Sequence, residues 1–184
     1  MTALDFFARW RVRLGYVLAL VVLWLARPTP HSILFGAALG FFGLWIRAYA
    51  AGFLYKQEVL TVTGPYARTR NPLYFGSSLL TVGAAVAMHS WWAAALLITY
   101  FALVYGFVMR REEIELRRQH GAAFDSYAAA VPLFFPRLSV GALGTTGNGG
   151  FSWKQYRKNH EYEAGIGFVL LLIALAVIWF LRGS

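Results

Sequence analysis

Uncharged apolar runs recur along the chain and alternate with short polar or cationic breaks. A membrane-spanning helix needs about 20 mostly apolar residues. The pattern predicts five such helices, over residues 14–26, 32–55, 73–88, 91–109 and 165–181. The first run is short, but the arginines before it can extend their charged heads to the interface while their stems stay apolar. We therefore predict an all-α, polytopic integral membrane bundle of about five helices, with residues 1–184 forming a single membrane domain.

Composition supports the bilayer as the solvent for most of this chain. Of its 184 residues, 59% are hydrophobic and 14% are charged, whereas ordinary soluble domains are about 45–50% apolar and about 25% charged. A net charge of +9 can indicate nucleic-acid binding, but the cations lie between apolar and aromatic runs, so we expect no nucleic-acid partner. The absence of cysteine excludes disulfides, thiolate metal sites and a cysteine nucleophile.

The cations also predict an orientation. If the N-terminus is cytoplasmic and the five helices alternate, then 14 of the 17 lysines and arginines fall on the cytoplasmic side, as the positive-inside rule requires. Arg27 and Arg182 lie outside, and Arg47 lies within the second span. The long polar connections, residues 56–72 and 110–164, are then cytoplasmic, so any chemistry is expected to face the cytoplasm.

Four further features bear on packing and on the C-terminal region. Small residues at Gly36, Gly40 and Gly43 predict a close helix contact. Arg47 is open to two interpretations: it faces protein, cofactor or water within the bundle, or it extends to the interface. Residues 139–150 are glycine-rich but follow no strand, so they indicate a linker and not a dinucleotide-binding loop. Residues 151–184 predict an interfacial helix followed by the last span.

The first polar segment, residues 64–76, reads GPYARTRNPLYFG. Gly64 and Pro65 signal a turn, Asn71 is a good N-cap, and Pro72 suits the first helical position. A helix N-terminus favours anions, and Arg68 and Arg70 bring further donors to it. The segment therefore predicts a carboxylate or phosphate pocket, unless the two arginines serve only to orient the chain in the membrane.

The second polar segment, residues 110–136, continues the fourth span into a charged helix. Spacings of four residues predict surface ion pairs between Arg111 and Glu115 and between Glu113 and Arg117. Residues 119–121 signal a helix stop, and residues 131–136 form an apolar, proline-broken segment expected to dock back onto the membrane face. Taken alone, the segment favours a solvated, salt-bridged helix.

Taken together, the two segments resemble the GPY…RxPxYxG and EE…L…G…Y…VP…P signatures of the isoprenylcysteine carboxyl methyltransferase and phospholipid methyltransferase family. The resemblance covers about residues 32–138, which are predicted as a methyltransferase-like core. The chain departs from the family pattern at Asn71, where histidine is frequent, and at Ala67, where arginine is common. The matching positions occur in the family's order and are Gly64, Pro65, Tyr66, Arg70, Pro72, Tyr74, Gly76, Glu112, Glu113, Leu116, Gly121, Tyr127, Val131, Pro132 and Pro136.

The resemblance implies S-adenosylmethionine as cofactor, S-adenosylhomocysteine as product and no metal. It implies that Arg70, Asn71 and the amides around Leu73 and Tyr74 hold the cofactor's carboxylate. Glu112 and Glu113 would accept hydrogen bonds from its ribose or amino group, and with Arg70 they form the predicted catalytic set. Tyrosines would wall the adenine or contact the sulfonium, and residues 131–136 would close a lid. The full predicted cofactor-binding set is Tyr66, Arg70, Asn71, Pro72, Leu73, Tyr74, Gly76, Glu112, Glu113, Tyr127, Val131 and Pro132.

The resemblance also implies a lipophilic small-molecule or lipidated-peptide acceptor, with Arg47 as a partner for its head. An isoprenylcysteine-type carboxylate needs no base, whereas a lipid amine needs Glu112, Glu113 or His120 to take a proton. Two other functions stay open: an NADPH-dependent membrane reductase of the sterol-reductase kind, and a non-enzymatic membrane scaffold. The oligomeric state is also left open.

Overall fold

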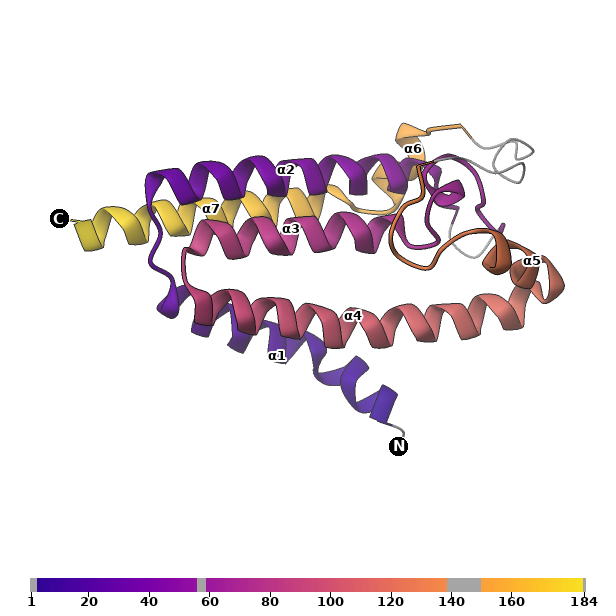
Figure 1. The fold of residues 1–184 in the computed structure, drawn as a ribbon, viewed down its shortest axis with the longest axis horizontal. Helices are drawn as coiled ribbons and strands as arrows, with labels where there is room; N and C mark the ends of the chain where they lie inside the picture. The colour runs from indigo at the N-terminus through magenta and orange to yellow at the C-terminus, as the bar shows by residue number, and fades with distance from the viewer. Residues whose placement is uncertain (1–2, 56–58, 139–149, 184) are drawn as a thin grey trace. The chain divides into compact units, whose positions relative to one another are not determined.

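A computed structural model describes residues 3–55, 59–138 and 150–183, and it describes the side chains of the first helix from residue 14 onward. Within these residues the chain forms helices and irregular segments and no strand, which confirms the all-α prediction. The predicted linker lies, apart from Gly150, outside the described residues. The helices are α1 (Ala3–Leu25), α2 (Pro30–Phe53), the 3₁₀ helix η1 (Gly64–Ala67), α3 (Pro72–Met88), α4 (Trp91–His120), α5 (Ala122–Ala130), α6 (Trp153–Lys158) and α7 (Tyr162–Gly183). Figure 1 labels the α-helices.

Each of the five predicted spans coincides with a helix. Three segments are long and apolar enough to cross a membrane: Pro30–Phe53, Trp91–His120 and Tyr162–Arg182. Two further apolar helices, Leu14–Leu25 and Pro72–Met88, are shorter. The protein is therefore a polytopic membrane helical protein, while the crossing of the bilayer by the two shorter helices and the cytoplasmic N-terminus stay predictions.

Local sequence signals account for the helix ends. Pro72 begins α3 directly after Asn71, as predicted. His89, with φ of 49°, makes the left-handed turn that separates α3 from α4. Gly121, with φ of 51°, ends α4 at the predicted stop. Glycine adopts such positive φ values without steric cost. Because no proline interrupts residues 91–120, α4 continues as one helix from its apolar part into its charged end.

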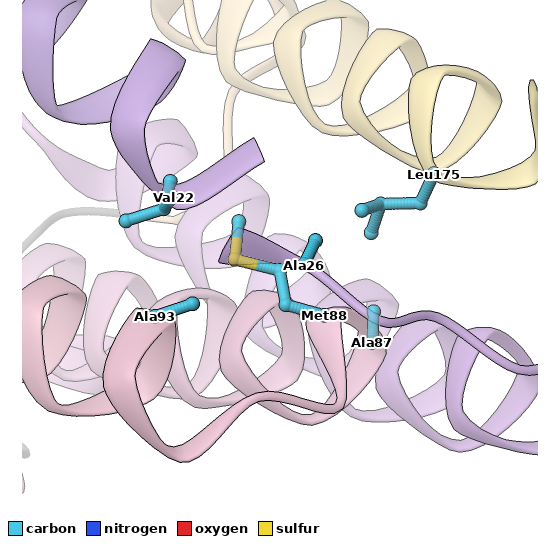
Figure 2. Close-up of a cluster of buried hydrophobic side chains, with 6 residues drawn as sticks. All are labelled: Val22, Ala26, Ala87, Met88, Ala93 and Leu175. Carbon is cyan, nitrogen blue, oxygen red and sulfur yellow. The ribbon is translucent and has the colours of Figure 1, made fainter. Parts of the chain in front are cut away.

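The helices contribute to two compact units. The first contains residues 1–41, 78–108 and 166–184, and the second contains residues 42–77 and 109–165. The core of the first unit combines the C-terminal end of α1 with residues of α3, α4 and α7. Figure 2 shows this cluster, and its buried members are Val22, Ala26, Ala87, Met88, Ala93 and Leu175.

Glycines allow very close packing between α2 and α3 within the first unit. A Cβ atom on Gly36 would lie 2.4 Å from the carbonyl oxygen of Gly83, and one on Gly83 would lie 2.7 Å from that of Gly36. A Cβ on Gly40 would lie 2.1 Å from the ring of Phe168 in α7. The predicted small-residue face is thereby confirmed as a packing surface, because any side chain there would collide with a neighbouring helix.

This packing predicts that Gly83→Ala destabilises the protein. The added methyl group would meet backbone atoms of α2, which cannot move independently, and overpacking typically costs about 1–3 kcal/mol. Gly106→Ala is the matched control, because a Cβ at Gly106 meets nothing within 4 Å and alanine favours the helix by up to about 1 kcal/mol. Thermal unfolding in detergent measures both. Equal midpoints for the two variants would contradict the close contact.

Candidate functional site

The first predicted motif forms a tight turn before α3 in the second unit. Gly64 has φ of 59°, and a Cβ there would lie 2.6 Å from the ring of Phe53, so both conformation and space require glycine. The backbone nitrogen of Phe75 donates to the carbonyl of Asn71 at 3.0 Å, which closes the first turn of α3. The side-chain nitrogen of Asn71 donates to the carbonyl of Leu133 at 3.0 Å. Asn71 therefore links the start of α3 to the predicted lid segment.

Backbone groups of residues 132–134 hold this turn in place. The nitrogen of Arg70 donates to the carbonyl of Pro132 at 2.9 Å. The hydroxyl of Thr69 donates to the carbonyl of Phe134 at 2.9 Å, and Thr69 is almost fully buried. Because these carbonyls cannot bond within a helix, docking against the turn satisfies them. The apolar, proline-broken segment thus docks on the first motif, as part of the site.

Arg137 extends the same contact. Its backbone nitrogen donates to the carbonyl of Arg68 at 3.0 Å. Its guanidinium donates to the carbonyls of Ala130 at 2.5 Å and Ala67 at 3.3 Å. Neither Thr69 nor Arg137 was predicted as a site residue. A side chain that donates to backbone carbonyls of a distant segment has no sequence signature, so only the folded arrangement identifies these two roles.

Tyr127 and Val131 belong to a buried cluster with Phe124. The hydroxyl of Tyr127 donates to the carbonyl of Tyr66 at 2.7 Å, and burial raises the pKa of Tyr127 above its ordinary value. Tyr127 therefore remains a neutral hydrogen-bond donor. Through this hydrogen bond, Tyr127 stabilises the turn that carries Tyr66.

The second motif meets the first through two acidic side chains of α4. Arg70 Nη1 donates to Glu113 Oε1, and the two side chains are 15% and 22% exposed. The hydroxyl of Tyr74 donates to Glu112 Oε1 at 2.6 Å. These two contacts join residues that are separated by 43 and 38 positions in the sequence, and both lie at the first turn of α3. The site thus combines a helix N-terminus, a paired arginine and two carboxylates.

The surface ion pairs expected along α4 are not the ones that form. Glu113 pairs with Arg70, and Arg117 pairs with Asp125 of α5 at 2.8 Å. Glu115 lies 3.6 Å from Arg118, one turn away. For Glu113 and Arg117 the expectation was wrong because it considered one helix in isolation, whereas α5 and the docked motif provide partners from other segments.

Several buried polar atoms at the site have no hydrogen-bond partner within the described part of the chain. They include the hydroxyl of Tyr66 and Nε of Arg70, Arg47 and Arg137. Burial is the main cause that raises the pKa of Tyr66 well above its ordinary value, and the charges of Glu161 and Glu112 add to the effect. The Tyr66 hydroxyl is therefore a protonated donor. Buried donors without partners are rare in native proteins and often mark a site for water, an ion or a ligand.

Arg68 and Arg70 do not converge, although both were expected at the helix N-terminus. The Arg68 guanidinium donates to the carbonyl of Leu138 at 2.8 Å, away from Glu113. The backbone of Arg68 is helical, with φ of −102° and ψ of −36°. Side chains two residues apart share a face only in an extended strand, so this bend sends the two arginines in different directions.

Leu73 and Gly76 contribute by packing. Leu73 packs against the buried cluster of Ala50, Phe53 and Tyr66. A Cβ on Gly76 would lie 2.7 Å from Cγ of Arg47 and 2.8 Å from the carbonyl oxygen of Gly43. These contacts bring α2 and α3 close together beside the first turn of α3. Their predicted contact with cofactor stays a prediction, as it does for Pro72, Val131 and Pro132.

Arg47 faces protein rather than extending to the interface. Its Nη2 lies 2.7 Å from Oε2 of Glu161. Its Nη1 donates to the hydroxyl of Ser77 and lies 3.5 Å from the carbonyl oxygen of Leu73. Of the two interpretations left open by the sequence, the structure supports burial within the bundle. Glu161 was not predicted, although an acidic residue beside a span that contains one arginine is a signal for such a pair.

A cavity of about 440 Å³ opens beside the turn, on α2 and α3. Aromatic and aliphatic side chains dominate its lining, and Arg68 is the charged residue among the described lining residues. Trp45 stacks on Tyr49 with ring centroids 6.1 Å apart, and Trp45 is 62% exposed. The lining residues are Trp45, Ile46, Tyr49, Gly64, Pro65, Ala67, Arg68, Thr69, Pro72, Phe75 and Pro136. An amphiphilic molecule fits this combination of apolar walls and one cation.

The two motifs therefore meet at one place, and comparison with known sequences identifies the family. The sequence matches the phospholipid methyltransferase family over residues 10–123. This chain belongs to that family. The family match begins within α1, further toward the N-terminus than the resemblance noted from the motifs, and it ends within α5. Within the described residues, no group of three or more histidine or acidic side chains is placed to hold a metal ion.

Two relatives of this chain carry names from metal resistance. Nickel-cobalt-cadmium resistance protein NccN of Alcaligenes xylosoxydans xylosoxydans is 34% identical over 140 residues, which cover 71% of this chain and 64% of that protein. Cobalt-zinc-cadmium resistance protein CzcN of Cupriavidus metallidurans is 33% identical over 140 residues, which cover 71% and 63%. The chain thus spans just under two thirds of each relative. No solved structure matches it.

The hydrogen bond from Tyr127 predicts a stability effect. Tyr127→Phe removes the donor to the buried carbonyl of Tyr66, and an unsatisfied buried acceptor costs about 1–3 kcal/mol. Chemical or thermal unfolding in detergent measures the change. Tyr16→Phe is the control, because Tyr16 is 70% exposed. An unchanged unfolding midpoint for Tyr127→Phe would show that this bond does not support the turn.

Proposed function

We propose that this protein transfers the methyl group of S-adenosylmethionine to a lipophilic acceptor at the cytoplasmic face of a membrane. Membership of the phospholipid methyltransferase family supports the reaction class. Helices long and apolar enough to span a bilayer support the location. The observation that carries the proposal is the meeting of the two motifs at the first turn of α3, where Arg70 pairs with Glu113 and Tyr74 with Glu112.

The donor groups of this site fit the cofactor. S-adenosylmethionine offers a carboxylate, an ammonium group and two ribose hydroxyls. Arg70, with donors beyond the one used by Glu113, and the first-turn amides of α3 suit the carboxylate. Glu112 and Glu113 each have a second oxygen that can accept from the ammonium group or ribose. The buried, unpartnered Tyr66 hydroxyl and Arg70 Nε also support a polar ligand here.

The cofactor, when bound, supplies an electrophilic methyl group on a sulfonium. In the proposed transfer, a lone pair of the acceptor forms the bond to the methyl carbon while the carbon–sulfur bond breaks and its electron pair stays on sulfur. A carboxylate acceptor is ionised at neutral pH and needs no base. A lipid amine must lose one proton, for which Glu112, Glu113 and His120 are the candidates. The protein's own contribution is to position the groups and exclude water.

The cavity beside the turn supports a place for the acceptor. Trp45, Tyr49 and Phe75 provide an aromatic wall, and Arg68 provides a cation suited to a carboxylate or phosphate. Arg47, the partner predicted from the sequence, is bound to Glu161. We therefore assign the acceptor's apolar body to this cavity and prefer Arg68 over Arg47 as partner for an anionic head. An isoprenylcysteine-type carboxylate agrees better with this lining than an amine does.

The proposed cofactor site is tested by titrating purified protein in detergent with S-adenosylhomocysteine, the product of the proposed reaction. We expect saturable binding, and Arg70→Gln should raise the Kd by at least about tenfold, because charge-assisted hydrogen bonds contribute about 1.5–3 kcal/mol. Arg117→Gln is the matched control, since Arg117 is half exposed and pairs with Asp125. Calorimetric titration measures each Kd.

Two outcomes of that titration would favour other functions. Saturable binding of NADPH without binding of S-adenosylhomocysteine would support the membrane reductase. Wild-type affinity in both Arg70→Gln and Glu112→Gln would support a scaffold that keeps the fold without using these residues.

If the cavity holds the acceptor, filling it should impair methyl transfer without impairing cofactor binding. Ile46→Trp should fill the cavity and lower methyl transfer to membrane lipids or lipidated peptides by at least about tenfold, while the Kd for S-adenosylhomocysteine stays unchanged. Membranes incubated with S-adenosylmethionine carrying a labelled methyl group, followed by mass spectrometry, identify the product. Leu34→Trp is the control, because Leu34 is 66% exposed and does not line the cavity. Full labelling by Ile46→Trp would exclude the cavity as the acceptor site.

A further inference from the structure

A buried carboxylate outside both motifs reaches the same site. Glu161 lies between α6 and α7, well beyond residue 123, where the family match ends. Its side chain is 8% exposed, and its Oε2 lies 2.7 Å from Nη2 of Arg47, which is 18% exposed. Its charge also contributes to raising the pKa of the Tyr66 hydroxyl, after burial and the effect of Tyr127. Glu161 is thus close to two residues that surround the start of α3.

The segment that carries Glu161 is attached to the end of α2. The backbone nitrogen of Ser152 donates to the carbonyl of Gly52 at 2.9 Å. The side chain of Asn159 donates to the carbonyls of Ala51 at 2.9 Å and Leu54 at 3.1 Å. The last carbonyls of a helix have no partners within it, so these bonds cap α2. They fix the position of the turn that follows.

The backbone at His160 directs Glu161 inward. His160 has φ of 55°, a left-handed conformation that non-glycine residues seldom adopt. This bend lies between the docked Asn159 and the first residue of α7, Tyr162. Glu163, two residues further on, has a side chain that is 68% exposed. Of the two carboxylates that flank Tyr162, only Glu161 is buried and paired with Arg47, whereas Glu163 faces outward.

Arg47 transmits this contact to α3. Its Nη1 donates to the hydroxyl of Ser77, which in turn donates to the carbonyl of Leu73 at 2.9 Å. Cγ of Arg47 packs against Gly76, because a Cβ atom added to Gly76 would lie only 2.7 Å from it. The stem and the head of Arg47 therefore both contact the first two turns of α3. Since a buried guanidinium needs an anionic partner, the position of Arg47 depends on Glu161.

We propose that Glu161 is a positioning residue of the cofactor site. By holding Arg47 across residues 73–77, it orders the N-terminal turn of α3 and places a negative charge near Tyr66. The segment after the family match would then complete the site instead of serving only as a membrane anchor. The proposal rests on the proposed function, because the site it completes is the one assigned to S-adenosylmethionine.

Glu161→Gln, with Glu163→Gln as the matched control, tests the proposal in the full-length protein in detergent. In the unliganded state, backbone amides of residues 73–77 should exchange hydrogen for deuterium at least about tenfold faster in Glu161→Gln, because local opening becomes easier. The Kd for S-adenosylhomocysteine should rise at least about tenfold. Glu163→Gln should match wild type in both, and Glu161→Asp, which keeps the charge on a shorter side chain, should give an intermediate Kd.

The measurements separate the ways in which this assignment can fail. A lower unfolding midpoint for Glu161→Gln with wild-type Kd and exchange, measured well below the midpoint, would reduce Glu161 to a structural role and overturn the proposal. Absence of S-adenosylhomocysteine binding by the wild-type protein would instead contradict the proposed function. Exchange at residues 73–77 would then decide by itself whether Glu161 orders α3.

Discussion

The docking of residues 132–134 onto the turn before α3 is the contact on which the site depends. It consists mainly of bonds between backbone groups or from buried side chains to backbone carbonyls, with Arg70, Thr69 and Asn71 as donors. Such bonds tolerate many side chains but require the two segments to keep their shapes. Gly64, with its positive φ, maintains one shape, and Pro132 and Pro136 restrict the other. The pairing of Arg70 with Glu113 follows from this docking.

The sequence was informative where structure is local. Asn71 and Pro72 predicted the start of α3, Gly121 predicted the end of α4, and the glycines of α2 predicted a close helix contact, because each depends on a few neighbouring residues. It also predicted correctly that the two motifs belong together, through their resemblance to one family. That resemblance contains long-range information that spacing and composition lack. The family match now supports it independently.

The sequence was uninformative where partners come from distant segments. Glu113 had a plausible partner four residues away, yet it pairs with Arg70. Arg68 and Arg70 are near neighbours in sequence, yet the bend at Arg68 separates them. Glu161 lies in a segment interpreted as interfacial, yet its carboxylate is buried on Arg47. For Glu113 and Glu161 the deciding quantity is desolvation in the folded chain, which selects the partner that a buried charge can reach, whereas for Arg68 it is the direction of the backbone.

The unbroken course of α4 restricts insertions within this helix. A helix of 30 residues rises about 45 Å, which exceeds the roughly 30 Å thickness of a bilayer's hydrocarbon core. Its apolar part and its acidic end therefore share one rigid register, since each residue adds about 100° of rotation. A single-residue insertion between Gly106 and Glu112 would turn both carboxylates away from Arg70 and Tyr74, whereas an insertion of seven would restore their direction but move them about 10.5 Å along the helix axis. Both rotation and rise therefore require the number of residues between Gly106 and Glu112 to stay constant.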